Sequence, residues 1–544
     1  MQELKNAQYV APQVRVTRRN LDFDQQTRLR AATGSSGHTS TDQSSTTTAS
    51  TGFESMSGSL LRRVNVITHA VHKSHQCIQL RGTNYINVYP LKMRVCFVIF
   101  WLKVFLALSM TISMLAYFCL EIYQLHLNAT PPNGFLPDRP IQIVDPATGK
   151  VDTGCNFDAS QGFARLQPQS KRQIMLGMSL DWHVETPLTM RRKLNGFNPL
   201  VYNTFMLFDA DMTGYYDRNS LNWFGSEVGK VGGILELTMQ PSTPDLSRYN
   251  DSMFDVLAQQ LYTINSQYGV PILLRFGHEM NGDWVVYGNR PLEFVALFRQ
   301  MAGFVRMYTN MTAMVWGPNV GTTYPYVGVG LSPIPTTGPE FEALDTNHDG
   351  VIDQLDDPYT PYYPGDDVVD WVALSLYYYP FDDCRNCPVP TTYFHDYLTG
   401  SGPVVAKAVD PDKYSSQYTS VHSFYNMFCT SGSHNKPILL PETGSPYVPE
   451  YGSGPGQWNE VDIKMAWWNQ IFNQSTLDQF PNLLVAVNFE EAKEKTTTNL
   501  TNDWRLTKNS VVLNTFLGLL SSFRSNLKEA GDFVYGCDGS VKGK

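Results

Sequence analysis

Short apolar runs alternate with amphipathic stretches over the C-terminal two-thirds of the chain. Eight runs have the length and composition of buried strands: Ile174–Leu180, Thr204–Phe208, Gly233–Met239, Ile272–Phe276, Ala313–Trp316, Val369–Leu376, Ile438–Leu440 and Leu483–Phe489. Helical patterns lie between or after them: Met253–Ser266, Leu292–Tyr308, Ser416–Cys429, Glu460–Phe472 and Val511–Leu527. Strands that alternate with helices pair in parallel, so the pattern predicts an α/β fold. Eight such strands within residues 171–530 predict a (β/α)8 TIM barrel.

An open, doubly wound sheet is the alternative arrangement of these elements. Sheets of that kind bind nucleotides through a glycine-rich loop after a strand. No such loop follows any of the eight runs, which favours the barrel.

A different apolar pattern precedes this domain. Val95–Leu120 contains 26 residues with Lys103 as its single charge, and roughly 20 apolar residues suffice to cross a bilayer. The run is longer than the core of a signal peptide, and 94 residues precede it. A buried globular helix is the remaining alternative. We predict a transmembrane helix over residues 95–123.

Charge is distributed unevenly about that segment. Residues 1–94 hold 12 basic and 5 acidic side chains, whereas the remainder holds 29 and 45. The positive-inside rule then predicts a cytosolic N-terminus and a lumenal or extracellular C-terminal domain. These features predict a single-pass type II membrane protein with a signal-anchor. No folded basic face is visible, which argues against binding to nucleic acid.

The segments outside the barrel are polar or rich in proline. Residues 1–94 include the Ser/Thr-rich stretch Ala32–Gly52, which lacks the apolar content needed to order a chain, so they predict a disordered basic cytosolic tail. Residues 124–170 contain six prolines and predict a lumenal stem. Residues 531–544 are expected to form a C-terminal tail.

Cysteines and glycosylation sequons agree with an oxidising compartment. Five cysteines follow the apolar segment, which allows at most two disulfides within the chain and leaves one thiol: Cys155, Cys384, Cys387, Cys429 and Cys537. Five N-x-S/T sequons also follow it, and they predict a glycoprotein: Asn128, Asn250, Asn310, Asn473 and Asn499.

The segment DTNHDGVIDQLD, residues 345–356, has the spacing of a calcium-binding loop. Its candidate ligands stand at the positions that such a loop uses: Asp345, Asn347, Asp349, Val351, Asp353 and Asp356. Asp356 replaces the usual bidentate glutamate, and Pro358 prevents the helix that normally follows. Either a structural calcium ion or a plain Asp/Asn/Gly turn accounts for the pattern.

Two glutamates stand where apolar strands end in turns that contain glycine. PILLRFGHEMNGDW, residues 271–284, contains Glu279, and KPILLPETGSPY, residues 436–447, contains Glu442. Strand ends meet at the carboxyl edge of a barrel, and a pair of carboxylates there suits glycoside hydrolysis. The alternative is that each is a solvated loop carboxylate. Gly282 stands where a zinc protease would have its second histidine, which excludes that class.

These two segments carry a family resemblance. RFGHEMNGDW and LLPETG resemble the acid/base and nucleophile segments of glycoside hydrolase family 26, the retaining (β/α)8 β-mannanases and related β-glucanases. Three further stretches are similar to that family in the expected order: MVWGPN (314–319), YYPGDDVVDWVALSLY (362–377) and DWR (503–505). The resemblance covers roughly residues 170 to 525.

The resemblance implies a role for individual residues. Glu279 corresponds to the acid/base and Glu442 to the nucleophile, and catalysis requires no cofactor. The candidate substrate-binding residues are His278, Arg275, Trp284, Tyr377, Trp504 and Arg505. Among them, Tyr377 matches a tyrosine that hydrogen-bonds the nucleophile, and Trp284 and Trp504 match sugar platforms. A structural histidine and core aromatic residues are the alternatives.

One departure from the family affects specificity. The stretch ILELTMQP, residues 234–241, lacks the Trp–His pair that mannan-active relatives place near its end, so recognition of mannose is open. The sequence as a whole predicts a membrane-anchored retaining endo-β-glycanase that hydrolyses β-mannan or β-glucan with two glutamates. The alternative is a catalytically inactive glycan-binding or a transglycosylating wall-assembly protein on the same fold.

Overall fold

The structure is a computed structural model that describes most of the chain after residue 155. It describes residues 156–544 except 171, 210–216, 322–323, 327–329, 379–385, 403–421, 454–455, 457 and 496–498, together with residues 104, 143–144 and 151–152. The predicted cytosolic tail and nearly all of the predicted transmembrane helix, residues 95–123, lie outside this part. Within it, no helix combines the length and the apolar character that crossing a membrane requires.

Eight parallel strands form a closed barrel, as the sequence predicts. In order around the barrel they are β3 (Ile174–Leu180), β4 (Val201–Phe208), β5 (Ile234–Pro241), β6 (Ile272–Phe276), β7 (Thr312–Trp316), β8 (Trp371–Ala373), β10 (Ile438–Gly444) and β11 (Leu483–Glu490). β11 pairs with β3 and closes the ring. The short strands β9 (Leu376–Tyr377) and β14 (Leu527–Lys528) pair with β10 and β3.

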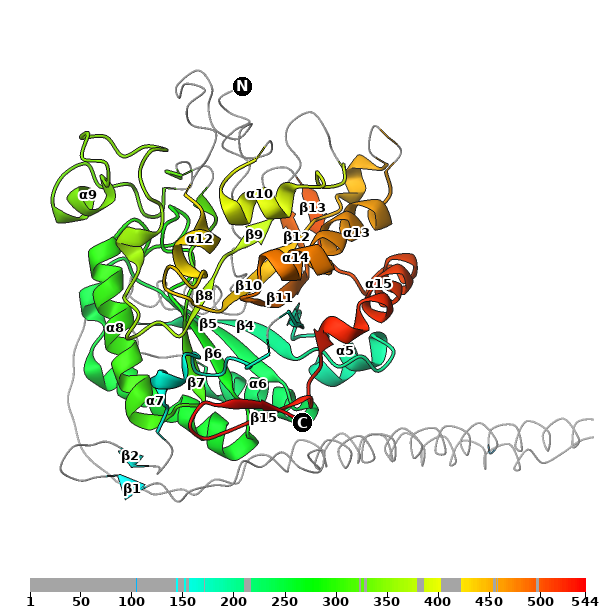
Figure 1. Ribbon diagram of the computed structural model, residues 1–544, viewed down its shortest axis with the longest axis horizontal. Helices are drawn as coiled ribbons and strands as arrows, with labels where there is room; N and C mark the ends of the chain where they lie inside the picture. Colours follow the sequence, from blue (N-terminus) through cyan, green and yellow to red (C-terminus); the bar gives the residue numbers. More distant parts are fainter. Residues whose placement is uncertain are drawn as a thin grey trace, which may run out of the picture. The chain divides into compact units, whose positions relative to one another are not determined.

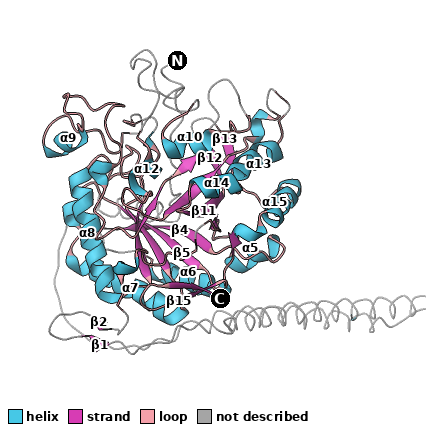
Figure 2. Cartoon of the chain, in the orientation of Figure 1, coloured by secondary structure: helices cyan, strands magenta, loops and turns pink. Residues whose placement is uncertain are grey.

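Helices surround the barrel, and Figures 1 and 2 show them outside the strands. The described helices are α5 (Pro187–Lys193), α6 (Arg218–Val231), α7 (Asp251–Tyr268), α8 (Pro291–Tyr308), α9 (Pro339–Leu344), α10 (Tyr393–Thr399), α12 (Phe424–Phe428), α13 (Glu460–Ile471), α14 (Gln474–Gln479) and α15 (Ser510–Ser522). The long helices turn apolar side chains toward the strands, and these form the larger of two main cores. Burial of that interface is the main stabilising contribution.

Short elements complete the domain. The 3₁₀ turns are η2 (Ala159–Gln161), η3 (Leu246–Arg248), η5 (Thr360–Tyr362), η6 (Pro449–Tyr451) and η7 (Arg524–Asn526). Three antiparallel pairs are β1–β2 (Ile143–Val144, Val151–Asp152), β12–β13 (Ala492–Lys495, Leu500–Asp503) and β15–β16 (Phe533–Tyr535, Val541–Gly543). The β12–β13 pair extends from β11 at the carboxyl edge of the barrel.

The second core fills the amino-terminal end of the barrel interior. It is built from residues near the start of each strand, such as Leu273 and Trp371, and from the β15–β16 hairpin, which adds Phe533, Tyr535 and Val541. Figure 1 shows this hairpin at the lower edge of the barrel. The last residues, expected to be a tail, therefore close the bottom of the domain.

The start of the domain also differs from the prediction. Leu166, placed by the sequence in the stem 124–170, is buried in the same lower core. The side chain of the neighbouring Arg165 donates to Asp370, and its carbonyl accepts from the indole of Trp371. The end of the predicted stem is thus part of the barrel domain, because these contacts join it to the start of β8.

Cysteine pairing agrees with the count in the sequence. Among the described residues, Cys387 and Cys537 each take part in a disulfide, and Cys429 is a buried free thiol. One thiol was expected to be left over. Glycosylation of the sequons stays a prediction, and in the structure the side chains of Asn250 and Asn473 cap helices α7 and α14.

Candidate active site

A strained turn after β6 places Glu279 at the carboxyl end of the barrel. Gly277 has φ of 65° and Glu279 has φ of 52°, in the left-handed region that side chains other than glycine rarely adopt. Such a conformation costs about 1–3 kcal/mol and persists where the surroundings enforce it. Here the Glu279 amide donates to the Gly317 carbonyl at 2.8 Å, and its carbonyl accepts from the Gly282 amide at 3.0 Å.

The Glu279 carboxyl is buried and accepts hydrogen bonds from side chains of neighbouring loops. The indole Nε1 of Trp284 donates to Oε2 at 2.6 Å, and the amide of Asn319 donates to Oε1 at 2.9 Å. Burial raises the pKa of Glu279, the charge of Glu442 raises it further, and Arg275 opposes both. A carboxyl with a raised pKa keeps its proton closer to neutral pH, which suits a general acid.

Glu442 lies in β10 in a contrasting environment. Nη1 of Arg275 donates to its Oε1 at 2.6 Å, and the hydroxyl of Tyr377 donates to its Oε2 at 3.1 Å. Both Glu442 and Arg275 are almost fully buried. Burial lowers the pKa of Arg275, but Glu442 and Glu236 raise it above its usual value. The guanidinium therefore stays charged, and its hydrogen bond fixes the orientation of the Glu442 carboxyl group.

The structure brings the two predicted glutamates to one place. Arg275 also donates from Nη2 to the Ser375 hydroxyl at 2.5 Å, and the Ser375 side chain is hydrogen-bonded to Glu279. A chain of contacts thus runs from Glu279 through Ser375 and Arg275 to Glu442. Arg275 was predicted to bind substrate. In the structure its guanidinium group donates hydrogen bonds to Glu442 and Ser375, and the side chain is fully buried.

His278 lies beside the acid with a fixed ring. The hydroxyl of Tyr287 donates to the His278 carbonyl at 2.7 Å and lies 3.2 Å from Nδ1. Because the Tyr287 hydroxyl proton is donated to the carbonyl, the contact with Nδ1 requires that Nδ1–H donate to the tyrosine oxygen. In this tautomer Nε2 is an acceptor. Burial lowers the pKa of His278 well below its usual value, and Arg275 acts in the same direction. The ring is therefore neutral and able to accept from a sugar hydroxyl.

Aromatic side chains surround both carboxylates. Trp284 is buried, donates to Glu279 and packs edge-on against Tyr326, with ring centroids 4.8 Å apart. It orients the acid, whereas its role as a sugar platform stays a prediction. Trp504 lies 5.8 Å from the Tyr377 ring and 5.3 Å from the Phe489 ring, measured between centroids. This aromatic cluster borders Glu442 through Tyr377.

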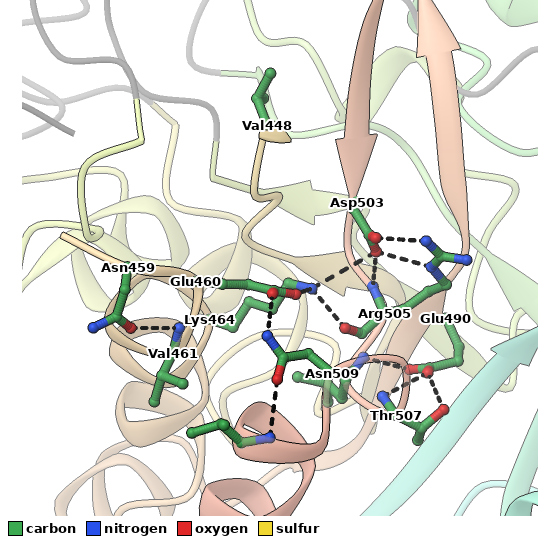
Figure 3. A network of polar contacts seen from close by, with 12 residues as sticks. Val448, Asn459, Glu460, Val461, Lys464, Glu490, Asp503, Arg505, Thr507 and Asn509 are labelled. Carbon is green, nitrogen blue, oxygen red and sulfur yellow. Dashed lines mark hydrogen bonds and ion pairs between the residues drawn. The ribbon is translucent and has the colours of Figure 1, made fainter. Parts of the chain in front are cut away.

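A polar network fixes the turn that carries Trp504 (Figure 3). The buried Lys464 of α13 donates to the Arg505 carbonyl and to Glu460, each at 2.6 Å, and forms an ion pair with Asp503 at 3.7 Å. Arg505 pairs with Asp503 through two side-chain hydrogen bonds of 3.0 and 2.6 Å. Part of the hydrogen-bonding capacity of the Arg505 guanidinium is thus used within the protein, and a third of the side chain is exposed. Substrate contact by Arg505 stays a prediction.

The same turn is held from the barrel side by Glu490. This buried carboxylate, at the end of β11, accepts from the amides of Leu506 and Thr507 at 2.8 Å each and from the Thr507 hydroxyl at 2.7 Å. The residues on either side of Trp504 are therefore fixed by two charged groups from different elements, Lys464 and Glu490.

Sequence analysis missed a further buried carboxyl on which Arg275 acts, Glu236 in β5. Asn203 donates to its Oε2, and the Thr238 hydroxyl donates to its Oε1 at 3.2 Å. Burial raises the pKa of Glu236 to about 8, Arg275 lowers it and Glu442 raises it. The signal was present, because Glu236 is the single charged residue in the apolar stretch ILELTMQP and shares one strand face with Thr238.

The predicted calcium loop is closed by its own hydrogen bonds. Oδ1 of Asp356 accepts from the amides of Thr346 and Asn347, and its Oδ2 accepts from the Asp353 amide. Asp345 accepts from the Asp349 and Gly350 amides. No group of three or more His, Cys, Asp or Glu side chains in the described part of the chain is arranged to hold a metal ion. Calcium binding stays a prediction.

One known protein family matches part of the chain. Residues 235–324 match the family described as glycosyl hydrolase family 26, which confirms the resemblance seen in the motifs. No curated protein matches the chain.

Among solved structures, the chain is similar to a GH26 β-mannanase from Bacteroides ovatus, with 15% identity over 66% of this chain and 91% of that chain and a TM-score of 0.38. It is also similar to the catalytic domain of a Bacillus sp. GH26 endo-β-1,4-mannanase, with 17% identity over 66% of this chain and 88% of that chain and a TM-score of 0.38.

Proposed function

We propose that this chain, a glycoside hydrolase with a family 26 match over residues 235–324, is a retaining endo-β-glycanase. Its substrate is a neutral β-1,4-linked or mixed-linkage polysaccharide of the mannan or glucan type. Glu442 is the nucleophile and Glu279 is the acid/base. The alternative of an inactive glycan-binding protein is less well supported, because both carboxyl groups and their partners are present.

The observation that carries this proposal is the contrast between the two buried glutamates. Arg275 and Tyr377 donate hydrogen bonds to Glu442 and orient it, whereas burial raises the pKa of Glu279. In the first step Glu442 attacks the anomeric carbon, and Glu279 protonates the leaving oxygen. A covalent glycosyl-enzyme forms, and water resolves it with Glu279 as base. Retaining enzymes place these carboxyl groups about 5–5.5 Å apart.

The electrostatic coupling explains how Glu279 changes role between the steps. The negative charge of Glu442 raises the pKa of Glu279 in the free enzyme. When Glu442 becomes an ester, that charge disappears, while the positive charge of Arg275 remains. The pKa of Glu279 then falls, so the group that gave its proton in the first step is ready to accept one from water.

A β-glycan panel assayed with a secreted form of residues 124–544 tests this function. Glu442→Ala and Glu279→Ala should each lower kcat on polysaccharide by roughly a thousandfold or more. Glu293→Ala on α8 is the matched control, because the Glu293 side chain is half exposed. Its kcat should equal that of wild type. Turnover that is unchanged in both variants would falsify the assignment.

Azide separates the two roles. With an activated aryl glycoside, azide should restore cleavage by Glu442→Ala and give the α-glycosyl azide, because one displacement inverts the anomeric carbon. With Glu279→Ala, azide should give the β-glycosyl azide, because it resolves an intermediate that Glu442 has formed. The opposite pattern would exchange the roles. Analysis of products longer than the substrate in the same assay measures transglycosylation.

A membrane-anchored, lumenal or extracellular position is also part of the proposal, and it rests on the sequence of residues 95–123 and their flanks. The full-length protein in microsomes should keep its C-terminal domain after protease treatment and should lose mass with an N-glycosidase. A C-terminal domain digested in intact microsomes would contradict this arrangement.

A further inference from the structure

A charged pair at the start of the β12–β13 hairpin has no place in the mechanism described so far. Glu491 directly follows β11, and Lys493 lies two residues later in β12. Nζ of Lys493 is 3.7 Å from Glu491 Oε2 and 4.6 Å from the centroid of the Phe489 ring. Both charged side chains are about three-quarters covered, with 27% exposed.

This pair belongs to the surroundings of the nucleophile. The Phe489 ring beneath Lys493 lies 6.0 Å from the Tyr377 ring, and the Tyr377 hydroxyl donates to Glu442. Burial raises the pKa of Glu491 and lowers that of Lys493, and the negative charge of Glu442 acts on both groups in the upward direction. The ammonium and its carboxylate partner therefore lie within electrostatic range of the catalytic glutamate, on the hairpin that also leads to Trp504.

The Lys493 ammonium has hydrogen-bonding capacity to spare. It carries three N–H donors, and among the described residues its one polar partner is Glu491, at an ion-pair distance longer than a good hydrogen bond. Burial lowers the pKa of Lys493, and Glu491 partly restores it. These donors are open to an acceptor that enters from solvent, because about a quarter of the side chain is exposed.

Two neighbouring hydroxyl groups of a sugar would satisfy both members of the pair. One hydroxyl oxygen accepts from the ammonium, and the adjacent hydroxyl donates to the carboxylate. We propose that Lys493 and Glu491 together bind a vicinal diol on the sugar that Glu442 attacks, and so help to determine which hexose the enzyme accepts. This inference deepens the proposed function and rests on it.

The charges around the pair also define the class of sugar. Burial raises the pKa of Glu491, and the negative charges of Asp181 and Glu442 raise it further, so two other carboxylates act on the pair. A uronic acid in this position would add another negative charge to a site that is already negative. The reacting sugar is therefore a neutral hexosyl unit.

The test compares Lys493→Met and Glu491→Gln with wild type on aryl β-oligoglycosides of mannose and of glucose. Lys542→Met, in the hairpin at the opposite end of the barrel, is the matched control. Loss of a hydrogen bond to a charged group should lower kcat/KM by roughly 10- to 100-fold in each variant, and the control should be unchanged. Melting temperatures identify any variant that fails to fold.

Substrates that lack one hydroxyl make the test specific. Removing a hydroxyl that Lys493 binds should lower kcat/KM for wild type but make little further difference to Lys493→Met, because the partner is already gone. If both enzymes lose the same factor for every deoxy substrate, the pair acts only on the hairpin and the proposal is wrong.

The outcomes also separate this inference from the proposed function. A wild-type enzyme that cleaves the panel, with Lys493→Met and Glu491→Gln equally active, overturns the diol site alone. A wild-type enzyme that cleaves no member of the panel overturns the glycanase assignment itself. Preference of the wild type for a uronosyl substrate over its neutral counterpart contradicts the charge argument.

Discussion

The two ends of the barrel interior are built from the same strands but differ in chemistry. At the amino-terminal end, apolar side chains such as Leu273 and Trp371 pack against the β15–β16 hairpin. At the carboxyl end, the interior holds Glu236, Arg275 and Glu442, all almost fully buried. The lower, amino-terminal end is an ordinary hydrophobic core. The upper, carboxyl end buries several charged side chains, although they lie only a few residues further along the same strands.

One step of two residues along a strand separates these environments. Side chains alternate across a strand, so Leu273 and Arg275 share the inward face of β6, and Ile234 and Glu236 share that of β5. The lower residue stabilises the domain by excluding water. The upper residue is stable only because each charged group has a partner, and the same partners fix the geometry that catalysis requires.

The largest effect on stability and turnover should come from a substitution of Arg275, the charged residue on the inward face of β6. Arg275→Met leaves Glu442 buried without its cation, so we expect a loss of about 3–5 kcal/mol in the free energy of unfolding. Turnover should fall by roughly a hundredfold or more, because a buried carboxylate without its cation tends to bind a proton and is then a poor nucleophile. Chemical denaturation and kinetics on an aryl glycoside measure the two effects.

Leu273→Ala is the control two residues earlier on the same face. It should cost about 2–5 kcal/mol in stability through the cavity it leaves, with turnover close to wild type well below its melting temperature. Equal losses of turnover in both variants would mean that the two ends of the interior are not functionally distinct.

The next effect concerns the closure of the lower end. Phe533→Ala removes a buried ring of the β15–β16 hairpin from the lower core. We expect a loss of about 3–5 kcal/mol in the free energy of unfolding, with kcat and KM unchanged at low temperature. Val534→Ala, whose side chain is exposed in the same strand, should be almost neutral. If the hairpin does not contribute to the stability of the domain, Phe533→Ala and Val534→Ala should both have the same small effect.

The upper end was largely predictable from sequence, because its strongest signals are local. An apolar run followed by a polar turn marks each strand end, and Glu279 and Glu442 are read directly from such places. The strand bounds at Ile174–Leu180 and Ile272–Phe276 agree with the structure. The predicted strand Val369–Leu376 is instead divided into β8 and β9, and the intervening Ser375 bonds to Arg275.

The rest depends on contacts between distant segments. Nothing local in residues 531–544 indicates that Phe533 and Tyr535 complete a core that begins with β3. The helix α6 was not predicted, because glycines and polar residues weaken its apolar periodicity. Likewise, an isolated glutamate in β5 does not reveal that Arg275 and Asn203 will surround it, because those partners come from neighbouring strands.

The proton on Glu236 gives a smaller effect that depends on pH. The folded state holds this proton up to a pKa of about 8, above the unfolded value of 4.5. Its stabilising contribution is therefore complete below pH 4.5 and is lost as the pH rises through about 8. Relative to Glu236→Gln, wild type should lose stability over this range, on the order of a few kcal/mol. Denaturation midpoints at several pH values test this, and parallel curves for the two proteins would contradict it.

The smallest effect should come from outside the barrel, through the network that holds Trp504. In Lys464→Met, Asp503 keeps its two bonds from Arg505, and Glu460 keeps the Asn509 amide at 2.7 Å, so no carboxylate is left without a donor. We expect KM to rise by roughly three- to tenfold, the cost of about one net hydrogen bond, with kcat nearly unchanged.

Arg299→Met provides the comparison, because it also removes a cation from an ion pair but at the surface. The pair between Arg299 and Asp367 is about half exposed, and exposed pairs contribute little. It should therefore change neither constant. If Lys464→Met instead lowers kcat and leaves KM unchanged, the turn acts on the reacting groups rather than on sugar binding. The polar character of the upper end would then extend through α13 to the catalytic step itself.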